Sequence, residues 1–121
     1  MKTWPSVERC VPALRGLSAG ERAIRCVVLH HTWRPDHAGW RGDAGAEAIL
    51  AFWLRRQRAE GWRNPPGAHF LVAPDGRVYA PFQNLALPLN ANGNANANRE
   101  GVAVEAVGDF DTGRDLLQGV Q

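Results

Sequence analysis

Residues 26–31, Cys-Val-Val-Leu-His-His, carry the first strong signal for a β-strand. A continuous run of apolar and β-branched residues is typical of a strand that is covered on both of its faces. We therefore predict a central strand of a sheet at this position. Side chains alternate along a strand, so Val28 and His30 share one face while Leu29 and His31 share the other.

A helix is predicted to follow over residues 43–60. Asp43 occupies the position of an N-cap, and Gly61 stands where glycine commonly ends a helix. Apolar residues spaced by three and four positions form one stripe that faces a core: Ala46, Ile49 and Trp53. We interpret this stripe as packing and not as a binding surface.

A β-hairpin is predicted after the helix. Two short apolar segments, His69–Val72 and Arg77–Tyr79, flank the sequence Pro74-Asp75-Gly76. Asp-Gly between two such segments is a strong signal for a tight turn that joins two antiparallel strands.

The last third of the chain contains one further strand. Residues 90–98 alternate Asn with Ala or Gly, and because these three residue types are poor strand formers we predict an exposed loop. Apolar residues return in Gly101–Val107, which we interpret as a strand that ends at Gly108. Residues 114–121 have the pattern of a helix that is just beginning.

The order of these elements predicts a mixed α/β fold, with a central mixed β-sheet flanked by helices. In such sheets, ligands bind beyond the carboxyl ends of the strands. His30 and His31 lie at the carboxyl end of the first predicted strand, where this rule places a site.

Chain length limits the number of domains. With 121 residues, 45% of them hydrophobic, the protein is large enough for one core and too short for two ordinary domains. We divide it into an N-terminal segment, residues 1–25, and one domain, residues 26–121. No apolar stretch has the length of a membrane span or of a signal peptide.

Charge and cysteine content exclude some functions. The net charge is +2 and the arginines are scattered along the chain, so nucleic acid is not indicated as a partner. Cys10 and Cys26 lack the spacing of a zinc-binding motif, and both a disulfide and simple burial remain open. The oligomeric state is not predicted.

The two adjacent histidines are candidates for metal binding. A hydrolytic zinc site needs about three protein ligands and one position left for water, because the metal lowers the pKa of that water and polarises the carbonyl under attack. Only one of two neighbouring strand residues enters a given pocket easily, so His30 supplies at most one ligand. A purely structural role for His30 and His31 is the alternative.

Several short motifs follow one another along the chain. They are Val27–Thr32, Gly67–Val72 leading into Asp75–Tyr79, Gly93–Asn96, and Gly101–Glu105 followed by Gly108–Asp111. In this order and spacing they resemble the N-acetylmuramoyl-L-alanine amidase family, which includes phage lysozyme-type amidases and animal peptidoglycan recognition proteins. The resemblance runs from about residue 26 to the end of the sequence.

The resemblance implies an activity and a location. The expected reaction is zinc-dependent hydrolysis of the amide bond between N-acetylmuramic acid and L-alanine in bacterial peptidoglycan, at the cell wall. Zn²⁺ is the implied cofactor, with His30 as a ligand, and Glu105 is the implied catalytic residue. Burial in an apolar strand would raise the pKa of Glu105, as an acid or base acting near neutral pH requires. A glutamate on the solvent side of the strand is the alternative.

The resemblance also implies substrate-binding roles for His31, His69 and Asn94. For His31 the alternative is packing, and for His69 it is a structural histidine, hydrogen-bonded at the start of the hairpin. Ala68 stands where some members of the family have a tyrosine, so any role of that phenol in polarising the carbonyl is absent here.

The sequence departs from the family at two points. The family's other zinc ligands, a histidine and then a cysteine or aspartate, belong to a segment beyond the one that Gly108–Asp111 matches. This sequence has no histidine after His69 and no cysteine after Cys26, so we expect the domain to be incomplete at its C-terminus. Residues 89–93 also lack the histidine of the family's Trp-His-Ala-Gly motif. Two further hypotheses therefore stand beside the enzyme: a non-catalytic peptidoglycan-binding module, and a structural subunit on the same scaffold.

Overall fold

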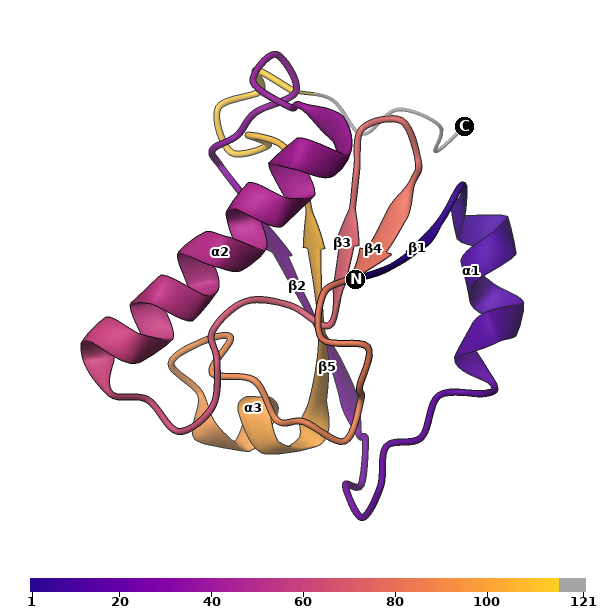
Figure 1. The fold of residues 1–121 in the computed structure, drawn as a ribbon, viewed down its shortest axis with the longest axis vertical. Coiled ribbons are helices and arrows are strands. Elements are labelled where there is room, and N and C mark those ends of the chain that lie inside the picture. The colour runs from indigo at the N-terminus through magenta and orange to yellow at the C-terminus, as the bar shows by residue number, and fades with distance from the viewer. Residues whose placement is uncertain (116–121) are drawn as a thin grey trace.

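The computed structural model describes residues 1–115, which form a five-stranded mixed sheet with three helices (Figure 1). In chain order the elements are β1 (Lys2–Trp4), α1 (Val7–Leu14), β2 (Cys26–His31), α2 (Gly42–Glu60), β3 (Phe70–Val72), β4 (Val78–Ala80), α3 (Ala95–Glu100) and β5 (Gly101–Ala106). The strand order is β1-β4-β3-β5-β2. Strand β5 runs parallel to both β2 and β3, whereas β4 is antiparallel to β3 and β1. The predicted mixed α/β fold is confirmed.

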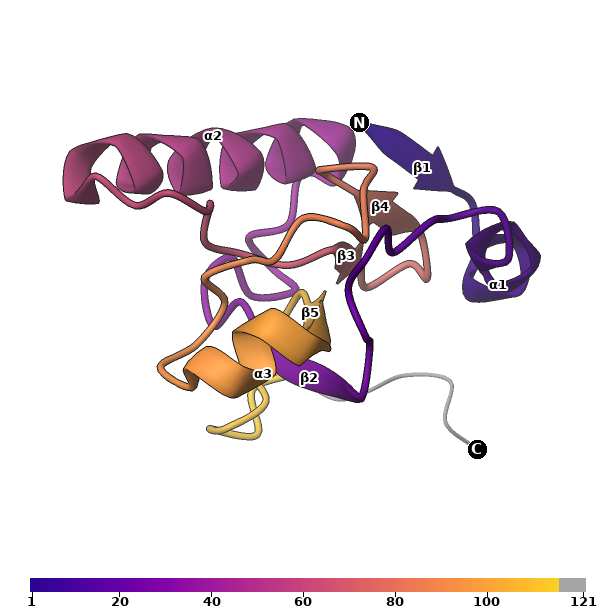
Figure 2. The same ribbon diagram turned by 90° about the horizontal axis from the view of Figure 1, so that it is seen from below.

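Helices α1 and α2 lie on opposite faces of the sheet, as the view from below shows (Figure 2). On the α1 face, Cys10 packs with Trp4 and Phe70. On the α2 face, Ala46 packs with Leu71 of β3. Residues 1–25, which we separated from the domain, thus contribute an edge strand and a helix to the same sheet and core.

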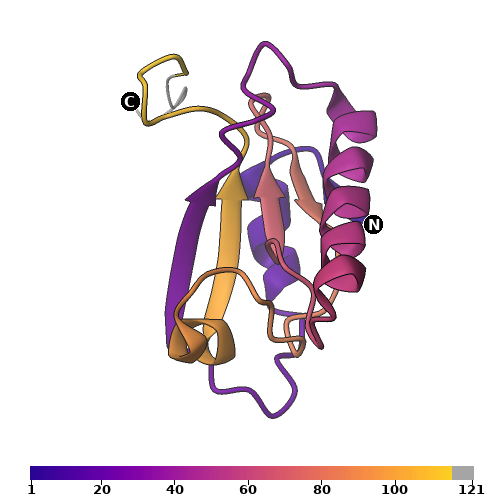
Figure 3. The ribbon, with the colours of Figure 1, turned by 90° about the vertical axis from the view of Figure 1, so that its left-hand side faces the viewer.

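Strand β2 is an edge strand, so the prediction of a central strand is wrong. It pairs with β5 alone among the described strands and forms the outer margin of the sheet (Figure 3). Val27 and Leu29 are 63% and 76% exposed. Neither side chain belongs to the core cluster that α1 forms with the sheet. An apolar run alone does not tell a covered strand from one whose outer face is open.

Helix α2 ends as predicted but begins differently. Gly61 closes it with a left-handed backbone (φ 68°). Arg41 is the N-cap and makes no side-chain capping bond, so the prediction of Asp43 as the cap is wrong. The Asp43 carboxylate instead accepts a hydrogen bond of 2.7 Å from the Tyr79 hydroxyl on β4. The predicted hairpin of β3 and β4 is confirmed, with Leu71 opposite Tyr79.

Part of the predicted Asn-rich loop is helical, because α3 covers residues 95–100. Asn94 acts as its N-cap and accepts a hydrogen bond of 3.1 Å from the N–H of Ala97. The helix ends at Gly101, where a side chain would collide with the carbonyl oxygen of Ala97. Poor strand formers thus supplied a helix cap and a short helix instead of a loop.

The end of the described chain shows little of the helix predicted there. Arg114 and Asp115 lie in a bend, and the rest of the helix predicted over residues 114–121 falls outside the described residues. In the part of the chain that is described, none of the helices is both long and apolar enough to cross a bilayer.

Candidate functional site

A cleft lies between α2 and two neighbouring strands, the edge strand β2 and the adjacent β5. His30 on β2 is the register partner of Glu105 on β5, and both line the cleft. Its volume is about 260 Å³. The surrounding walls come from α2 and from two loops, and they include Phe52, Trp53, Arg56, Trp62, Gly67 and Asn90.

Glu105 is partly buried where it lines this cleft. Burial raises the pKa of its carboxyl group from 4.5 to about 7, while nearby His31 acts in the opposite direction. A carboxyl group with a pKa near 7 is present in both protonation states at neutral pH, so it is able to give or take a proton. Glu105 is therefore partly shielded from solvent, although it borders an open cleft.

His30 shares the cleft with Glu105. Its Nε2 atom is buried and has no hydrogen-bond partner within the described residues. A buried polar atom without a partner costs free energy, and in native proteins such atoms often mark a place where a ligand or ion binds. The side chain thus has the free nitrogen that a metal ligand requires.

His31 faces the other way, as the alternation along the strand predicts. Its Nδ1 lies 3.2 Å from the carbonyl oxygen of Gly108, and its Nε2 lies 3.1 Å from the carboxylate of Asp111. The ring also lies against Phe110, with centroids 5.9 Å apart. His31 borders the cleft, but its ring fastens β2 to the segment that follows β5.

His69 directly precedes β3 and is only 3% exposed. Its Nδ1 accepts a hydrogen bond of 3.0 Å from the N–H of Ala103, so its Nε2 carries the proton and donates to the carbonyl oxygen of Leu87 at 2.8 Å. Burial lowers the pKa of His69 despite this bond to Leu87, and nearby Arg22 acts in the same direction as burial. Both ring nitrogens are therefore occupied by the protein, as in the structural alternative considered for this residue.

Arg22 joins its own loop to two other segments of the chain, residues 85–87 and 98–101. Its guanidinium donates to the backbone carbonyls of Leu85 and Leu87, and also to those of Asn98, Arg99 and Gly101. Arg22 and His69 share the Leu87 carbonyl, so together they fasten the loop that carries Asn90.

Asn94 is exposed and caps α3, as described above, and it does not line the cleft. Asn98, four residues further along the chain, accepts hydrogen bonds through its side-chain oxygen from the N–H groups of Ala91 and Asn92, each of 3.1 Å. Asn98 therefore shapes the wall at Asn90 and Ala91. Its position inside the Asn-rich segment was the available signal, but the alternating pattern did not distinguish it from the other asparagines.

Gly67 allows one wall of the cleft to pass close to the helix. It has a φ of 109°, and a Cβ atom at this position would lie 2.6 Å from Cε2 of the Trp53 indole. Only glycine fits such a backbone conformation and such a short distance. The predicted core residue Trp53 is indeed 6% exposed, yet its ring also lines the cleft.

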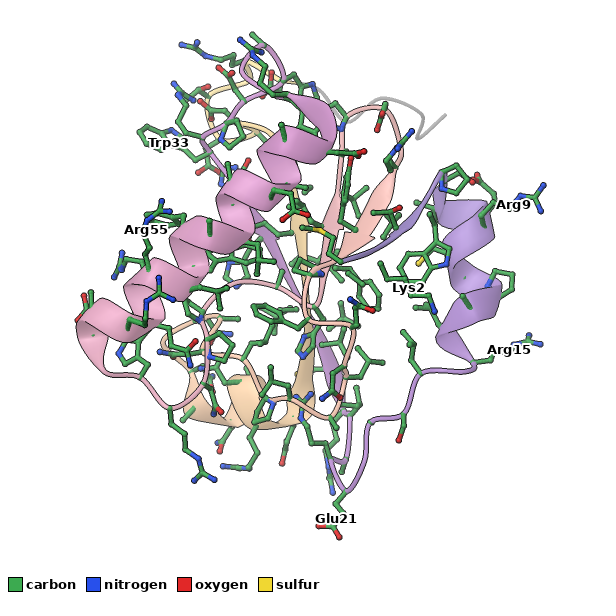
Figure 4. The ribbon with its side chains drawn as sticks, in the orientation of Figure 1. Lys2, Arg9, Arg15, Glu21, Trp33 and Arg55 are labelled. Atoms are coloured by element: carbon green, nitrogen blue, oxygen red, sulfur yellow. The ribbon has the colours of Figure 1, made fainter. Side chains whose placement is uncertain are left out.

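Trp33 follows β2 closely in the chain, and its side chain projects outward from the molecule (Figure 4). It is 56% exposed, has a φ of 56°, and has the guanidinium of Arg34 stacked 4.6 Å from its ring centroid. Arg34 also forms an ion pair of 3.1 Å with buried Asp109. The loop after β2 is thus fixed at the same end of the sheet as the cleft.

Sequence reasoning missed the aromatic and amide walls of the cleft. Phe52 and Arg56 lie one turn apart on α2, and Trp62 follows the glycine that ends this helix. The apolar stripe of α2 indicated packing, but a pattern within one helix gives no information about which loop will lie opposite it.

Comparison with models of known protein families shows which family the chain belongs to. A family model described as N-acetylmuramoyl-L-alanine amidase matches residues 20–118. The chain belongs to this family. The resemblance predicted from the motifs is confirmed, and the match begins slightly before the first of them. Comparisons with curated proteins and with solved structures gave no match.

The described part of this amidase-family chain does not contain a complete metal site. Residues 1–115 include no group of three histidine, cysteine, aspartate or glutamate side chains that is able to hold a metal ion. His30 fits the role of one ligand because its Nε2 is buried and free. The remaining ligands of a hydrolytic zinc site are not provided by these residues.

Proposed function

We propose that the cleft binds the N-acetylmuramoyl-L-alanine linkage of bacterial peptidoglycan and hydrolyses its amide bond. One observation carries the proposal: His30 and Glu105 lie opposite each other on adjacent strands and line the same cleft. Membership of the amidase family supports peptidoglycan as the substrate class. The place of action that follows is the bacterial cell wall.

Glu105 is the residue to which we attribute proton transfer. Hydrolysis adds water across the amide, so a proton must leave the attacking water and another must reach the nitrogen of L-alanine. A carboxylate that takes the first proton becomes the acid that supplies the second. The raised pKa of Glu105 suits both steps near neutral pH.

His30 is the residue to which we attribute metal binding. Zinc dependence belongs to this proposal, with His30 Nε2 as one ligand. Because residues 1–115 do not complete the coordination, zinc-dependent catalysis would require ligands that these residues do not supply.

A second candidate function is peptidoglycan binding without hydrolysis. The absence of a three-ligand group within the described residues favours it. The walls of the cleft form without a set of three metal ligands, so the protein would be able to bind peptidoglycan even if it does not hydrolyse it.

Two measurements on the 121-residue protein test these alternatives. Co-sedimentation with purified peptidoglycan measures binding, and release of stem peptides with and without added zinc measures hydrolysis. The proposal expects release of stem peptides that is lost in Glu105→Gln, while Glu47→Gln, on an exposed part of α2, keeps it. A higher release on addition of zinc would show that the metal takes part. Binding without release would favour the second candidate, and the absence of both would refute the two.

His30→Ala tests the metal ligand directly. The affinity for zinc, measured by titration at equilibrium, is expected to be lower in this variant than in the parent protein, because the free ring nitrogen is lost. Equal zinc affinity of both proteins would contradict the assignment of His30.

A further inference from the structure

A second hollow continues the cleft past the end of α2. It has a volume of about 380 Å³ and shares Trp62 and Asn90 with the hollow that contains His30 and Glu105. A bound chain that crosses His30 and Glu105 is therefore able to continue into this second hollow. Its lining includes Trp62, Arg63, Asn64, Pro88, Asn90 and Arg99.

The charge of this hollow is positive. Its lining contains two arginines and, in the part of the chain that is described, no carboxylate. The guanidinium of Arg63 makes no hydrogen bond or ion pair with any described residue. Arg99 is partly engaged, since it donates to Asn96 at 2.6 Å and lies 3.8 Å from Glu100. Arg63 thus retains the full set of donors with which arginine binds a carboxylate.

The backbone around Arg63 is held in place before any ligand binds. The side-chain amide of Gln57 on α2 donates to the carbonyl oxygens of Trp62 (3.3 Å) and Arg63 (3.1 Å). Across the hollow, the N–H of Asn90 donates to the carbonyl of Pro65 at 2.8 Å. A site whose walls are fixed in this way loses less entropy when a ligand binds.

The opposite flank of the cleft has a different character. Beyond Phe52, which lines both spaces, lies an apolar hollow of about 530 Å³ along the first half of α2. Its arginines are already engaged: Arg34 pairs with Asp109, and Arg41 donates to backbone carbonyls. This flank suits an uncharged chain better than an acidic one.

We propose that the hollow around Arg63 is a carboxylate-binding subsite, in which Arg63 recognises the acidic stem peptide of peptidoglycan. The inference rests on the proposed function, because that function supplies the peptide on one side of the cleft and the uncharged glycan on the other. The carboxylate pairs with the planar fork of the Arg63 guanidinium, while Trp62 and Asn90 contact the peptide as it leaves the cleft.

The test is a binding experiment in EDTA, so that the ligand is not consumed. The probes are N-acetylmuramoyl-L-alanyl-D-glutamate and the same molecule with both glutamate carboxyl groups converted to amides. Calorimetric titration measures the affinity of the parent protein, Arg63→Gln and Arg58→Gln for each probe. Arg58 is a matched control because it is exposed near the end of α2 and does not line either hollow.

The expected result is a preference of the parent protein for the acidic probe, and a loss of roughly tenfold in its affinity in Arg63→Gln, as for a charge-assisted hydrogen bond at a partly exposed site. Arg58→Gln is expected to keep the parental affinity, and the amidated probe to show little effect of Arg63→Gln. Equal affinity for both probes, no binding of either, or an equal loss in both arginine variants would overturn the inference.

Failure of the proposed function is distinguishable from failure of this inference. If no stem peptide is released with zinc but the charge preference depends on Arg63, the subsite stands and the hydrolase does not. If stem peptide is released but the preference is absent, the hydrolase stands and the subsite does not.

Discussion

Replacing Glu105 by glutamine should stabilise the protein at alkaline pH. Burial raises the pKa of this carboxyl group from 4.5 to about 7, a rise of roughly 2.5 pH units, which corresponds to ~3 kcal/mol against the charged form in the folded state. The folded protein holds this proton more tightly than the unfolded chain does. Its contribution is therefore most favourable below pH 4.5, and it becomes less favourable as pH rises towards 7.

Glutamine has a similar shape and carries no charge, so the variant avoids this cost. Relative to the parent, Glu105→Gln should be more stable by about 1 kcal/mol or less at pH 5 and by up to about 3 kcal/mol above pH 8. Urea denaturation followed by tryptophan fluorescence, in EDTA at pH 5 and pH 8.5, measures both values. Glu47→Gln, on an exposed part of α2, is the control and should show no such trend.

A difference between Glu105→Gln and the parent that stays the same at both pH values would refute the reasoning. It would mean that the carboxyl group of Glu105 is hydrated in the folded protein, and its proposed role in proton transfer near neutral pH would lose its physical basis.

Three other substitutions test the structure around the cleft, and urea denaturation measures each. Gly67→Ala should destabilise the protein by about 2 to 4 kcal/mol, because the new methyl group would overlap the Trp53 indole and the backbone has a positive φ at this position. Gly93→Ala is the control: its methyl group would meet no atom within 4 Å, so stability should change by less than about 0.5 kcal/mol. Arg22→Lys should cost about 1 to 3 kcal/mol, since an ammonium group is unable to reach five carbonyls at once; an unchanged midpoint would contradict the importance of this contact. Leu29→Thr should have an effect below about 0.5 kcal/mol, because this side chain is 76% exposed, and a large loss would show that the face is covered.

The parts of the fold that depend on local pattern were predicted from the sequence. The hairpin of β3 and β4 followed from its Asp-Gly turn, and the end of α2 from Gly61. Patterns of this kind act within a few residues, and the sequence contains them completely. The position of β2 in the sheet depends on strands that are far away in the chain, and its apolar residues gave the wrong answer.

Prediction of the site succeeded where alternation along a strand determined the outcome. Because His30 and His31 are neighbours on β2, their side chains leave the strand in opposite directions. Both residues line the cleft, but only His30 has a free ring nitrogen there, whereas the ring of His31 is bound to Gly108 and Asp111. Glu105 lies opposite His30 through the register of β2 and β5, which no local pattern specifies. The prediction of His30 as a metal ligand and of Glu105 as a catalytic residue stays a proposal.

The walls of the cleft could not be predicted for a related reason. Trp62 and Asn90 are far apart in the sequence and meet because Asn90 is bonded to Pro65 and because Arg22 and His69 hold the loop before it. The Asn-rich pattern was visible, but which asparagine caps a helix and which supports a loop depends on backbone geometry. Such roles emerge only from the folded chain.

The register that places His30 opposite Glu105 extends to the other end of the two strands. There Cys26 lies opposite Gly101, and the N–H of Arg25 donates to the carbonyl of Glu100 at 2.8 Å. A shift of β2 by a single position would carry His30 to the far side of the sheet and bring its neighbour into its place. Gly101 admits no side chain, so a substitution there would disturb the register of β2 and β5 and, with it, the position of Glu105 four residues away.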